Sequence, residues 1–153
     1  MKIEDNLKLL KITIPQLAKP VGTYVPAIRT GHLVFTSGQL PLTDGRLNFK
    51  GRVGKDVTVE NGQRAAKIAV INALSAVQWV VGDLNKVKKV VKLTGYVCSA
   101  IGFNDQAKVM NAGSELLTQI FGEEEGAHAR TTIGCIELPL GSCVEVDLIV
   151  EVK

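Results

Sequence analysis

Cysteine, histidine and aromatic residues are scarce in this chain, and each shortage excludes a class of protein. The cysteines Cys98, Cys135 and Cys143 are odd in number and lack C-x-x-C spacing, so we expect reduced thiols and no disulfide framework. The histidines His32 and His128 have no partner at metal-ligand spacing, which predicts no zinc or other structural metal. Aromatic residues make up only 5% of the chain and do not alternate with basic ones, which disfavours a stacking groove for nucleic acid.

Long apolar runs and strong net charge are also lacking. No stretch is long enough to span a bilayer, and the charged start at residues 1–5 is not followed by an apolar run long enough for a signal peptide. With reduced thiols, this predicts a cytoplasmic protein that binds no membrane. The formal charge is only +3, and one cluster of lysines fits a solvated strand edge better than a nucleic-acid surface (Lys86, Lys88, Lys89 and Lys92).

The apolar residues that are present indicate one folded domain of mixed structure. Of 153 residues, 46% are hydrophobic, which is enough for a sizeable core. Apolar spacing and turn residues first predict a short amphipathic helix at 1–12, strands at 24–29 and 33–37, and a possible short strand at 47–53. A helix from Thr58 to about Val81 and a strand at 86–99 follow. The chain then has a helix capped by Asn104 or Asp105 and ending at Gly122, and two final strands. This order predicts an α+β sandwich with two helices on one face of a mixed sheet.

The last two strands organise the chain. Alternate residues from Val144 to Val152 are apolar, so Glu145, Asp147 and Glu151 share the other face, and from the spacing alone a solvated sheet face is the favoured interpretation. If residues 138 and 143 pair across the intervening turn, Glu145 faces roughly Ile136. Arg130 is then about 20 Å away along the strand. One small molecule could not contact both side chains within a single chain. If both act on the same molecule, we hypothesise a pocket built where subunits meet.

Several motifs along the chain resemble those of the Rid family, the reactive intermediate deaminases also known as YjgF or endoribonuclease L-PSP proteins. The segments GTYVPA at 22–27 and FTSGQLP at 35–41 are similar to that family's Gly-Pro-Tyr and Thr-Ser-Gly-Gln-Ile-Pro motifs. Arg130 followed by Thr, the Glu-Leu-Pro at 137–139, Glu145 between two valines, and Asn111 in the second long helix complete the resemblance.

The resemblance implies a single domain over residues 1–153 with a fold similar to bacterial-type chorismate mutase. In this fold the helices cover one face of the sheet, and trimerisation covers the other, on or near which Ile133, Cys135 and Ile149 are expected. Compact members mostly lack residues equivalent to 1–19. We therefore interpret these as an N-terminal helical extension whose apolar stripe packs on the core.

The resemblance also implies a reaction: hydrolysis of 2-imino acids to 2-oxo acids and ammonia, with no cofactor. Arg130 would bind the substrate carboxylate through its planar guanidinium, and Glu145 would orient or activate the attacking water. The residues expected to line the pocket are Tyr24, Ser37, Gly38, Asn111 and Thr132. Two positions depart from the family pattern, because Thr132 replaces a common cysteine and His128 replaces a common proline.

Two other functions compete with the deaminase. The same clefts could bind small carboxylates such as 2-oxo acids without turning them over. Endoribonuclease action is disfavoured by the weak charge and by the lack of a histidine pair or stacking platform.

Overall fold

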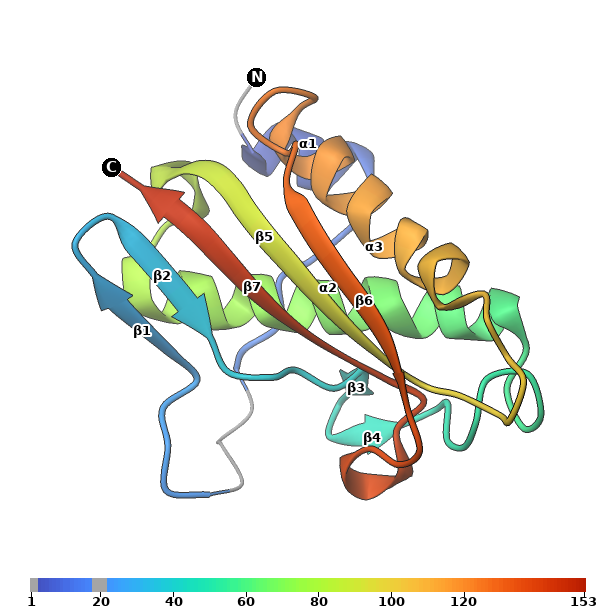
Figure 1. The fold of residues 1–153 in the computed structure, drawn as a ribbon. Coiled ribbons are helices and arrows are strands. Elements are labelled where there is room, and N and C mark those ends of the chain that lie inside the picture. Colours follow the sequence, from blue (N-terminus) through green and yellow to red (C-terminus); the bar gives the residue numbers. More distant parts are fainter. Residues whose placement is uncertain (1–2, 18–21) are drawn as a thin grey trace.

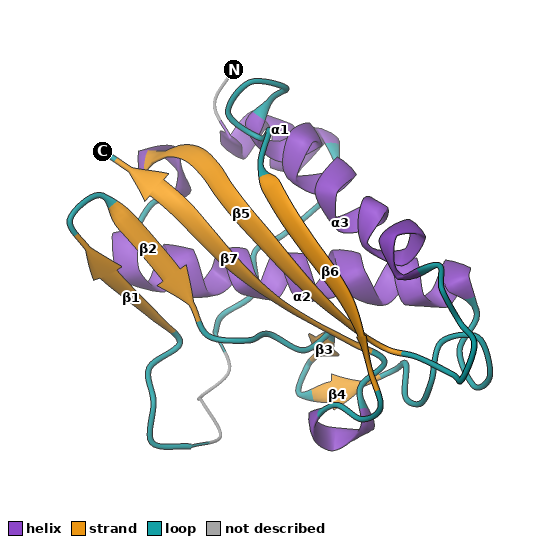
Figure 2. Cartoon of the chain, in the orientation of Figure 1, coloured by secondary structure: helices purple, strands orange, loops and turns teal. Residues whose placement is uncertain are grey.

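The chain folds into a five-stranded sheet that carries its helices on one face (Figures 1 and 2). The computed structural model describes residues 3–17 and 22–153. The elements in chain order are α1 (Ile3–Leu9), β1 (Ala27–Thr30), β2 (Leu33–Thr36), β3 (Leu42–Thr43), β4 (Arg46–Leu47), α2 (Val59–Val81), the 3₁₀ turn η1 (Leu84–Lys86), β5 (Val87–Cys98), α3 (Gln106–Phe121), β6 (Ala129–Cys135), the 3₁₀ turn η2 (Pro139–Gly141) and β7 (Val144–Val152). The predicted α+β architecture is confirmed.

The sheet has the strand order β1-β2-β7-β5-β6, and only the β5–β6 pair is parallel. A parallel connection needs a crossover, and α3 supplies it between β5 and β6. The short β3–β4 hairpin stands apart, and its two-residue turn uses the left-handed conformations of Asp44 and Gly45. Among the described residues, no helix combines the length and apolar character of a membrane span.

The core lies between the sheet and the two long helices. The alternate valines and Leu148 of β7 are fully buried, as their spacing predicts. On α2 the expected alanine stripe is buried against the sheet, since small side chains let a helix approach closely (Ala66, Ala69, Ala73 and Ala76). The predicted N-cap is also confirmed, because Thr58 Oγ1 accepts a hydrogen bond of 3.1 Å from the Asn61 amide.

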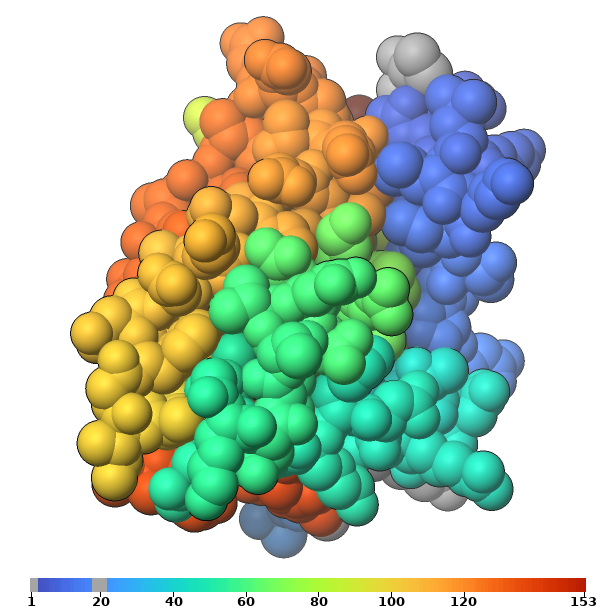
Figure 3. Space-filling view, turned by 90° about the vertical axis from the view of Figure 1, so that its right-hand side faces the viewer, coloured from blue at the N-terminus to red at the C-terminus, as the bar shows by residue number. Residues whose placement is uncertain are grey.

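The two remaining helices extend this layer. On α3, Val109, Gly113, Leu116 and Ile120 are buried as predicted. The helix α1 lies against the end of α3, where Asn6 Nδ2 donates 2.8 Å to the carbonyl of Ile120. Figure 3 shows this face, with the blue N-terminal segment beside the orange end of α3 and the green α2 below. The predicted amphipathic helix therefore forms, although it is shorter than expected and residues 1–2 lie outside the described part.

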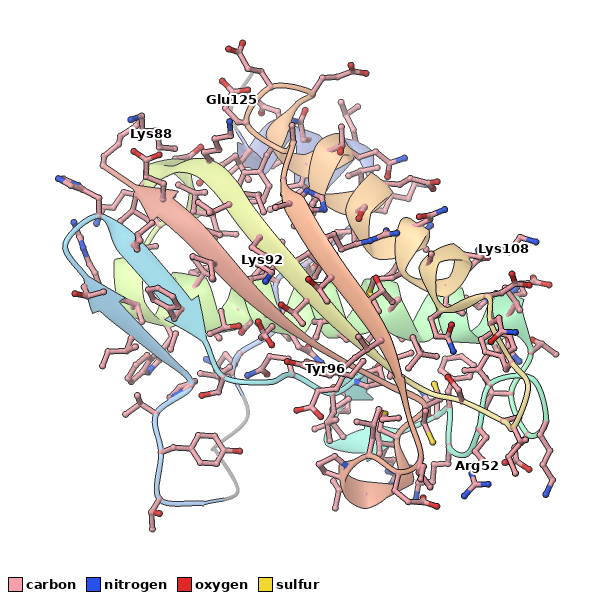
Figure 4. The ribbon with its side chains drawn as sticks, in the orientation of Figure 1. Arg52, Lys88, Lys92, Tyr96, Lys108 and Glu125 are labelled. Atoms are coloured by element: carbon pink, nitrogen blue, oxygen red, sulfur yellow. The ribbon has the colours of Figure 1, made fainter. Side chains whose placement is uncertain are left out.

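In the described part of the chain, no helix covers the opposite face of the sheet. Ile133 and Ile149 lie on this open face in the same rows as Tyr96 and Lys92 of β5, and Cys135 lies beside Cys98. Figure 4 shows Tyr96 and Lys92 on the side of the sheet away from the helices. Large apolar side chains stay exposed there, including Ile28, Phe35 and Ile133.

Three local predictions are wrong. β6 and β7 do not form a hairpin, because β5 lies between them, so Leu138 does not pair with Cys143 and Glu145 faces Tyr96 instead of Ile136. The first strand begins at Ala27, after the proline at 26, and Tyr24 precedes it in an exposed bend. The strand expected at 47–53 is reduced to Arg46–Leu47, with only isolated bridges beyond it.

The lysine cluster lies at the start of an interior strand. Pairing of β5 with β6 begins at Lys92, so the preceding half of β5 is paired with a strand on its β7 side alone. On the other side the Val90 amide donates 2.8 Å to the carbonyl of Glu125, so the edge that carries the lysines is only partly open. Lys88 forms a 2.7 Å ion pair with Glu151, and Lys86 donates 2.7 Å to the carbonyl of Val81. These two lysines are therefore engaged in local contacts of the fold.

Gly126 brings the chain from the end of α3 to the start of β6. It is buried, and a Cβ there would lie 2.5 Å from the Gly122 carbonyl oxygen and 2.7 Å from Thr118 Cα. Both atoms are backbone, which cannot swing away as a side chain can. Only glycine fits, and it fixes where β6 begins.

A Gly126→Ala variant should lose about 2 kcal/mol or more of unfolding free energy, because the added methyl group overlaps backbone. Gly31→Ala is the matched control: a Cβ at Gly31 meets no atom within 4 Å and carries only the left-handed backbone cost, about 1 kcal/mol. Urea unfolding followed by circular dichroism measures both. Equal losses would show that the turn at Gly126 can relax.

Candidate functional site

Arg130 lies on the helix side of the sheet, at its β6 edge. Its Cα pairs with that of Leu93, whose buried side chain points toward the helices, so the arginine side chain also projects toward α3. Arg130 Nη1 donates 3.0 Å to Ser114 Oγ, and Nη2 donates 3.4 Å to the carbonyl of Ala107. Both partners are neutral, and among the described residues Arg130 forms no ion pair.

Two other predicted residues lie beside this arginine. Asn111 is exposed on α3, and at 100° per residue it falls within about 60° of Ala107 and Ser114, the two residues that hold Arg130. Thr132 follows Arg130 by two residues and shares its side of β6. The Thr132 hydroxyl is buried without a hydrogen-bond partner among the described residues. We call Arg130, Asn111, Ser114, His128 and Thr132 the arginine cluster.

A second group of predicted residues lies on the open face, near Glu145. Glu145 is half-buried on β7, and its Oε1 atom occupies the space that a Cβ at Gly38 would fill, so the carboxylate lies directly against the Gly38 backbone. The segment after β2 is fixed alongside β7 by two backbone hydrogen bonds between Gln39 and Val146. Gly38 is therefore held against the carboxylate.

Ser37 ties this segment to the one that carries Tyr24. Its amide donates 2.8 Å to the carbonyl of Pro26, and its hydroxyl donates 2.6 Å to the carbonyl of Val25. Tyr24 is 56% exposed just before them. We call Ser37, Gly38 and Glu145 the carboxylate cluster; Tyr24 is connected to it through Val25 and Pro26, and no hydrogen bond among the described residues joins its side chain to Glu145.

Burial raises the pKa of the Glu145 carboxyl, and the nearby Asp147 carboxylate raises it further. Asp147 lies on the same face and accepts a 3.0 Å hydrogen bond from the Tyr96 hydroxyl. Burial, with this hydrogen bond, also raises the pKa of Tyr96. Glu145 is consequently a stronger proton acceptor than an exposed glutamate.

The two clusters lie on opposite faces of the sheet in one chain. Arg130 is in line with Leu93 and Leu148, whereas Glu145 is in line with Tyr96 and Ile133. Two strand spacings and three residues separate them, or about 14 Å between Cα atoms. Glu145 and Arg130 thus cannot contact one small molecule within a chain. The sequence also predicted that Arg130 and Glu145 are too far apart within one chain, but from an incorrect pairing of β6 with β7.

Comparison with known proteins places the chain in a family. Residues 4–152 match the model described as "YjgF/chorismate_mutase-like, putative endoribonuclease". The chain belongs to this YjgF/chorismate mutase-like family.

Relatives of high similarity agree with this assignment. Protein TCP17 of Trypanosoma cruzi is 40% identical over 99% of this chain and 95% of its own length. The crystal structure of Atu1372 from Agrobacterium tumefaciens, described as of unknown function, is 41% identical with a TM-score of 0.91, covering 99% of this chain and 92% of that one. A structure from Shewanella oneidensis MR-1, described as a "putative endoribonuclease", is 31% identical with a TM-score of 0.95, covering 99% and 100%.

Two members of the arginine cluster escaped the sequence analysis of this YjgF-like chain. Ser114 was not singled out, although it lies three residues after Asn111 on the same side of α3. His128 was noted only as a replacement for proline, and the structure shows its Nε2 atom 2.9 Å from Ser114 Oγ. A polar residue one helical turn from a predicted site residue was the available signal.

The cysteines and acidic residues offer little further chemistry. Cys98, Cys135 and Cys143 are free thiols, and burial raises the pKa of all three, to about 12 for Cys143. They are protonated at neutral pH and are weak nucleophiles. Within the described ranges, no three His, Cys, Asp or Glu side chains are placed to hold a metal ion.

The raised pKa of Glu145 has a measurable effect on stability. A carboxyl whose pKa is higher in the folded state opposes folding once it ionises, and this effect disappears below the unfolded-state value near 4.5. Glu145→Gln should therefore raise the melting temperature at pH 7.5 and leave it nearly unchanged at pH 4.

Glu151→Gln is a control with the opposite sign. The hydrogen bond from Lys88 lowers the pKa of Glu151, so this carboxylate stabilises the fold above about pH 4.5 and loses that effect as the pH falls through its folded value. The variant should melt slightly lower at pH 7.5, because an exposed ion pair contributes little. Scanning calorimetry at both pH values measures the two shifts, and a lower melting point of Glu145→Gln at pH 7.5 would contradict the assignment.

Proposed function

We propose that this protein hydrolyses small 2-imino acids to 2-oxo acids and ammonia, in clefts that two copies of the chain build together. The observation that carries the proposal is Arg130: a half-buried guanidinium held by two neutral groups, with no anionic partner among the described residues. Such an arginine is preorganised for a ligand that brings its own carboxylate.

Arg130 has donors to spare for that carboxylate. A guanidinium carries five N–H groups, and two are used by Ser114 and Ala107. The contact with Ala107 also brings the guanidinium to the first turn of α3, where the positive end of the helix dipole favours an anion. Asn111 adds an exposed polar group to the same surface, whereas the Thr132 hydroxyl, which has no hydrogen-bond partner among the described residues, is buried on the same side of β6.

Glu145 fits the proton transfers that the reaction needs. Water adds to the carbon of the protonated imine as Glu145 takes one of its protons, which gives a neutral tetrahedral carbinolamine. The same carboxyl then returns the proton to the nitrogen. As the C–N bond breaks and the C=O bond forms, ammonia leaves, and Glu145 takes the hydroxyl proton and passes it to the solvent or to the departing ammonia. The imine carbon is already electrophilic, so positioning and one carboxylate can suffice, and no cofactor takes part.

The opposite placement of the two clusters is what calls for a second copy. In the assembly we propose, a homotrimer, the β6 edge of one copy with its arginine cluster meets the open face of the next with its carboxylate cluster. The exposed side chains of Ile28, Phe35 and Ile133 give that face the apolar surface that a subunit contact buries.

The name RidA of one solved relative supports the choice of imine hydrolysis as the reaction. The structure of RidA from the Antarctic bacterium Psychrobacter sp. PAMC 21119 is 25% identical, with a TM-score of 0.58, covering 90% of this chain and 94% of that one.

The activity is tested by generating 2-aminoacrylate enzymatically and following loss of the derived imine by trapping. The full chain should accelerate this loss. Arg130→Ala and Glu145→Gln should each lower the rate at least a hundredfold, the usual range for a positioned proton-transfer group. Arg64→Ala, which removes an exposed arginine whose one ion pair among the described residues is with Glu60, is the control and should match wild type. An unchanged rate in Arg130→Ala would refute the proposal.

Subunit mixing tests whether the cleft is composite. If Arg130→Ala and Glu145→Gln chains are refolded together in equal amounts, about a quarter of the clefts should combine an intact Arg130 with an intact Glu145, so about a quarter of the activity should return. Each variant refolded alone is the control. A mixture as inactive as its components would place the whole site within one chain.

Two other functions share this surface and are separated by the same variants. A module that only binds 2-oxo acids would bind 2-oxobutanoate in calorimetry, lose binding in Arg130→Ala, and leave imine decay unaltered. Endoribonuclease action, which the family description names, would give RNA cleavage that survives further purification and disappears in Arg130→Ala.

A further inference from the structure

Arg130 is the last group of a chain of hydrogen bonds that begins at Gly126. The Gly126 carbonyl oxygen lies 2.6 Å from His128 Nδ1, and His128 Nε2 lies 2.9 Å from Ser114 Oγ. Ser114 Oγ lies in turn 3.0 Å from Arg130 Nη1. Four groups from the α3–β6 connection, the middle of α3 and β6 are thus linked in series.

The chemistry of the two ends fixes the direction of the first and last bonds, and a neutral imidazole fixes the direction of the middle one. A carbonyl only accepts, so His128 Nδ1 carries a proton, and a guanidinium only donates, so Ser114 Oγ accepts from Arg130. In a neutral imidazole protonated at Nδ1, Nε2 is an acceptor, and the Ser114 hydroxyl donates to it. A second proton on Nε2 would turn two donors toward the serine oxygen and set another cation beside the guanidinium.

We infer that Ser114 and His128 are positioning residues that hold the Arg130 guanidinium ready for an anionic ligand, through a neutral His128 protonated at Nδ1. The inference rests on the proposed function for the identity of the ligand, a small 2-oxo or 2-imino acid. A long arginine side chain that is already ordered loses less conformational freedom on binding, which strengthens binding without a new contact.

The chain of hydrogen bonds can restrain Arg130 because its far end, at Gly126, is fixed. Gly126 is buried with its Cα against the backbone of the last turn of α3, so its carbonyl cannot shift freely. His128 takes its orientation from that carbonyl, and Ser114 is carried by a helix whose neighbours Gly113 and Ala112 are buried. Arg130 is the one long and flexible member, and it is restrained from the rigid side.

The restraint can be measured without any ligand. In ¹⁵N-labelled full-length protein, the His128 ring should show a protonated Nδ1 and an unprotonated Nε2 at pH 7.5. The Arg130 Nε–H group should be rigid on the nanosecond timescale and become mobile in Ser114→Ala. A protonated Nε2 with a bare Nδ1, or equal mobility of Arg130 in the two proteins, would overturn the inference.

Ligand binding then tests the consequence. Ser114→Ala should weaken binding of 2-oxobutanoate in calorimetry about tenfold, the effect of one hydrogen bond to a charged group, and raise KM for the imine more than it lowers kcat. Ser114→Thr keeps a hydroxyl and should recover part of the loss. Gln119→Ala, an exposed change further along α3, is the control and should bind as wild type.

A pair of His128 variants separates its two contacts. His128→Gln keeps an acceptor for Ser114, whereas His128→Asn keeps a donor for the Gly126 carbonyl and loses the serine. We expect His128→Gln to bind 2-oxobutanoate more tightly than His128→Asn. The opposite order, with an active wild type, would refute the inference, whereas an inactive wild type that binds no 2-oxo acid would refute the proposed function and leave the ligand-free measurements to decide the inference.

Discussion

The parallel pairing of β5 with β6 is the constraint on which the arrangement of this protein depends. It requires a crossover, which α3 provides, and it puts β6 at the edge of the sheet directly beside that helix. Arg130 then shares a row with the buried Leu93 and points toward α3, not toward the open face. An antiparallel hairpin of β6 with β7 would have separated the arginine from Ser114 and Ala107, and the arginine cluster would not exist.

The electrostatics of the two clusters are complementary. Arg130 is held by a hydroxyl and a carbonyl, so its charge stays uncompensated among the described residues. Glu145 is half-buried near Asp147, and its raised pKa reflects the cost of keeping that charge. Ionisation of Glu145 is therefore unfavourable in an isolated chain, whereas Arg130 keeps free donors for an anion. A pKa shifted in this way is typical of binding and catalytic sites.

Much of the fold could be predicted because its signals are local. The alternation along β7, the alanine stripe of α2 and the Thr58 cap each depend on residues close in the sequence. Strand order is different, since nothing local indicates that β5 enters between β6 and β7. The side of the sheet toward which Arg130 points could not be predicted for a related reason. Residues on both sides of this edge strand are half-buried or exposed, so β6 shows little contrast between its faces. The chain of hydrogen bonds through Ser114 and His128 joins residues that are distant in the sequence, and only the crossover brings them together.

The same topology explains why a family motif spread over the whole chain can describe one site. The residues at 37 and 38 lie beside Glu145 because β2 pairs with β7 and the segment after it continues along the same strand, whereas Tyr24 lies in an exposed bend before β1. The residues at 111, 130 and 132 collect on the other side, because α3 lies over β6. No rotation of side chains can merge two groups separated by a packed sheet, whose row of Leu93 and Leu148 is fully buried. If all seven residues act on one molecule, the second group must come from another copy, and the exposed apolar face that carries Glu145 is the surface on which that copy can rest.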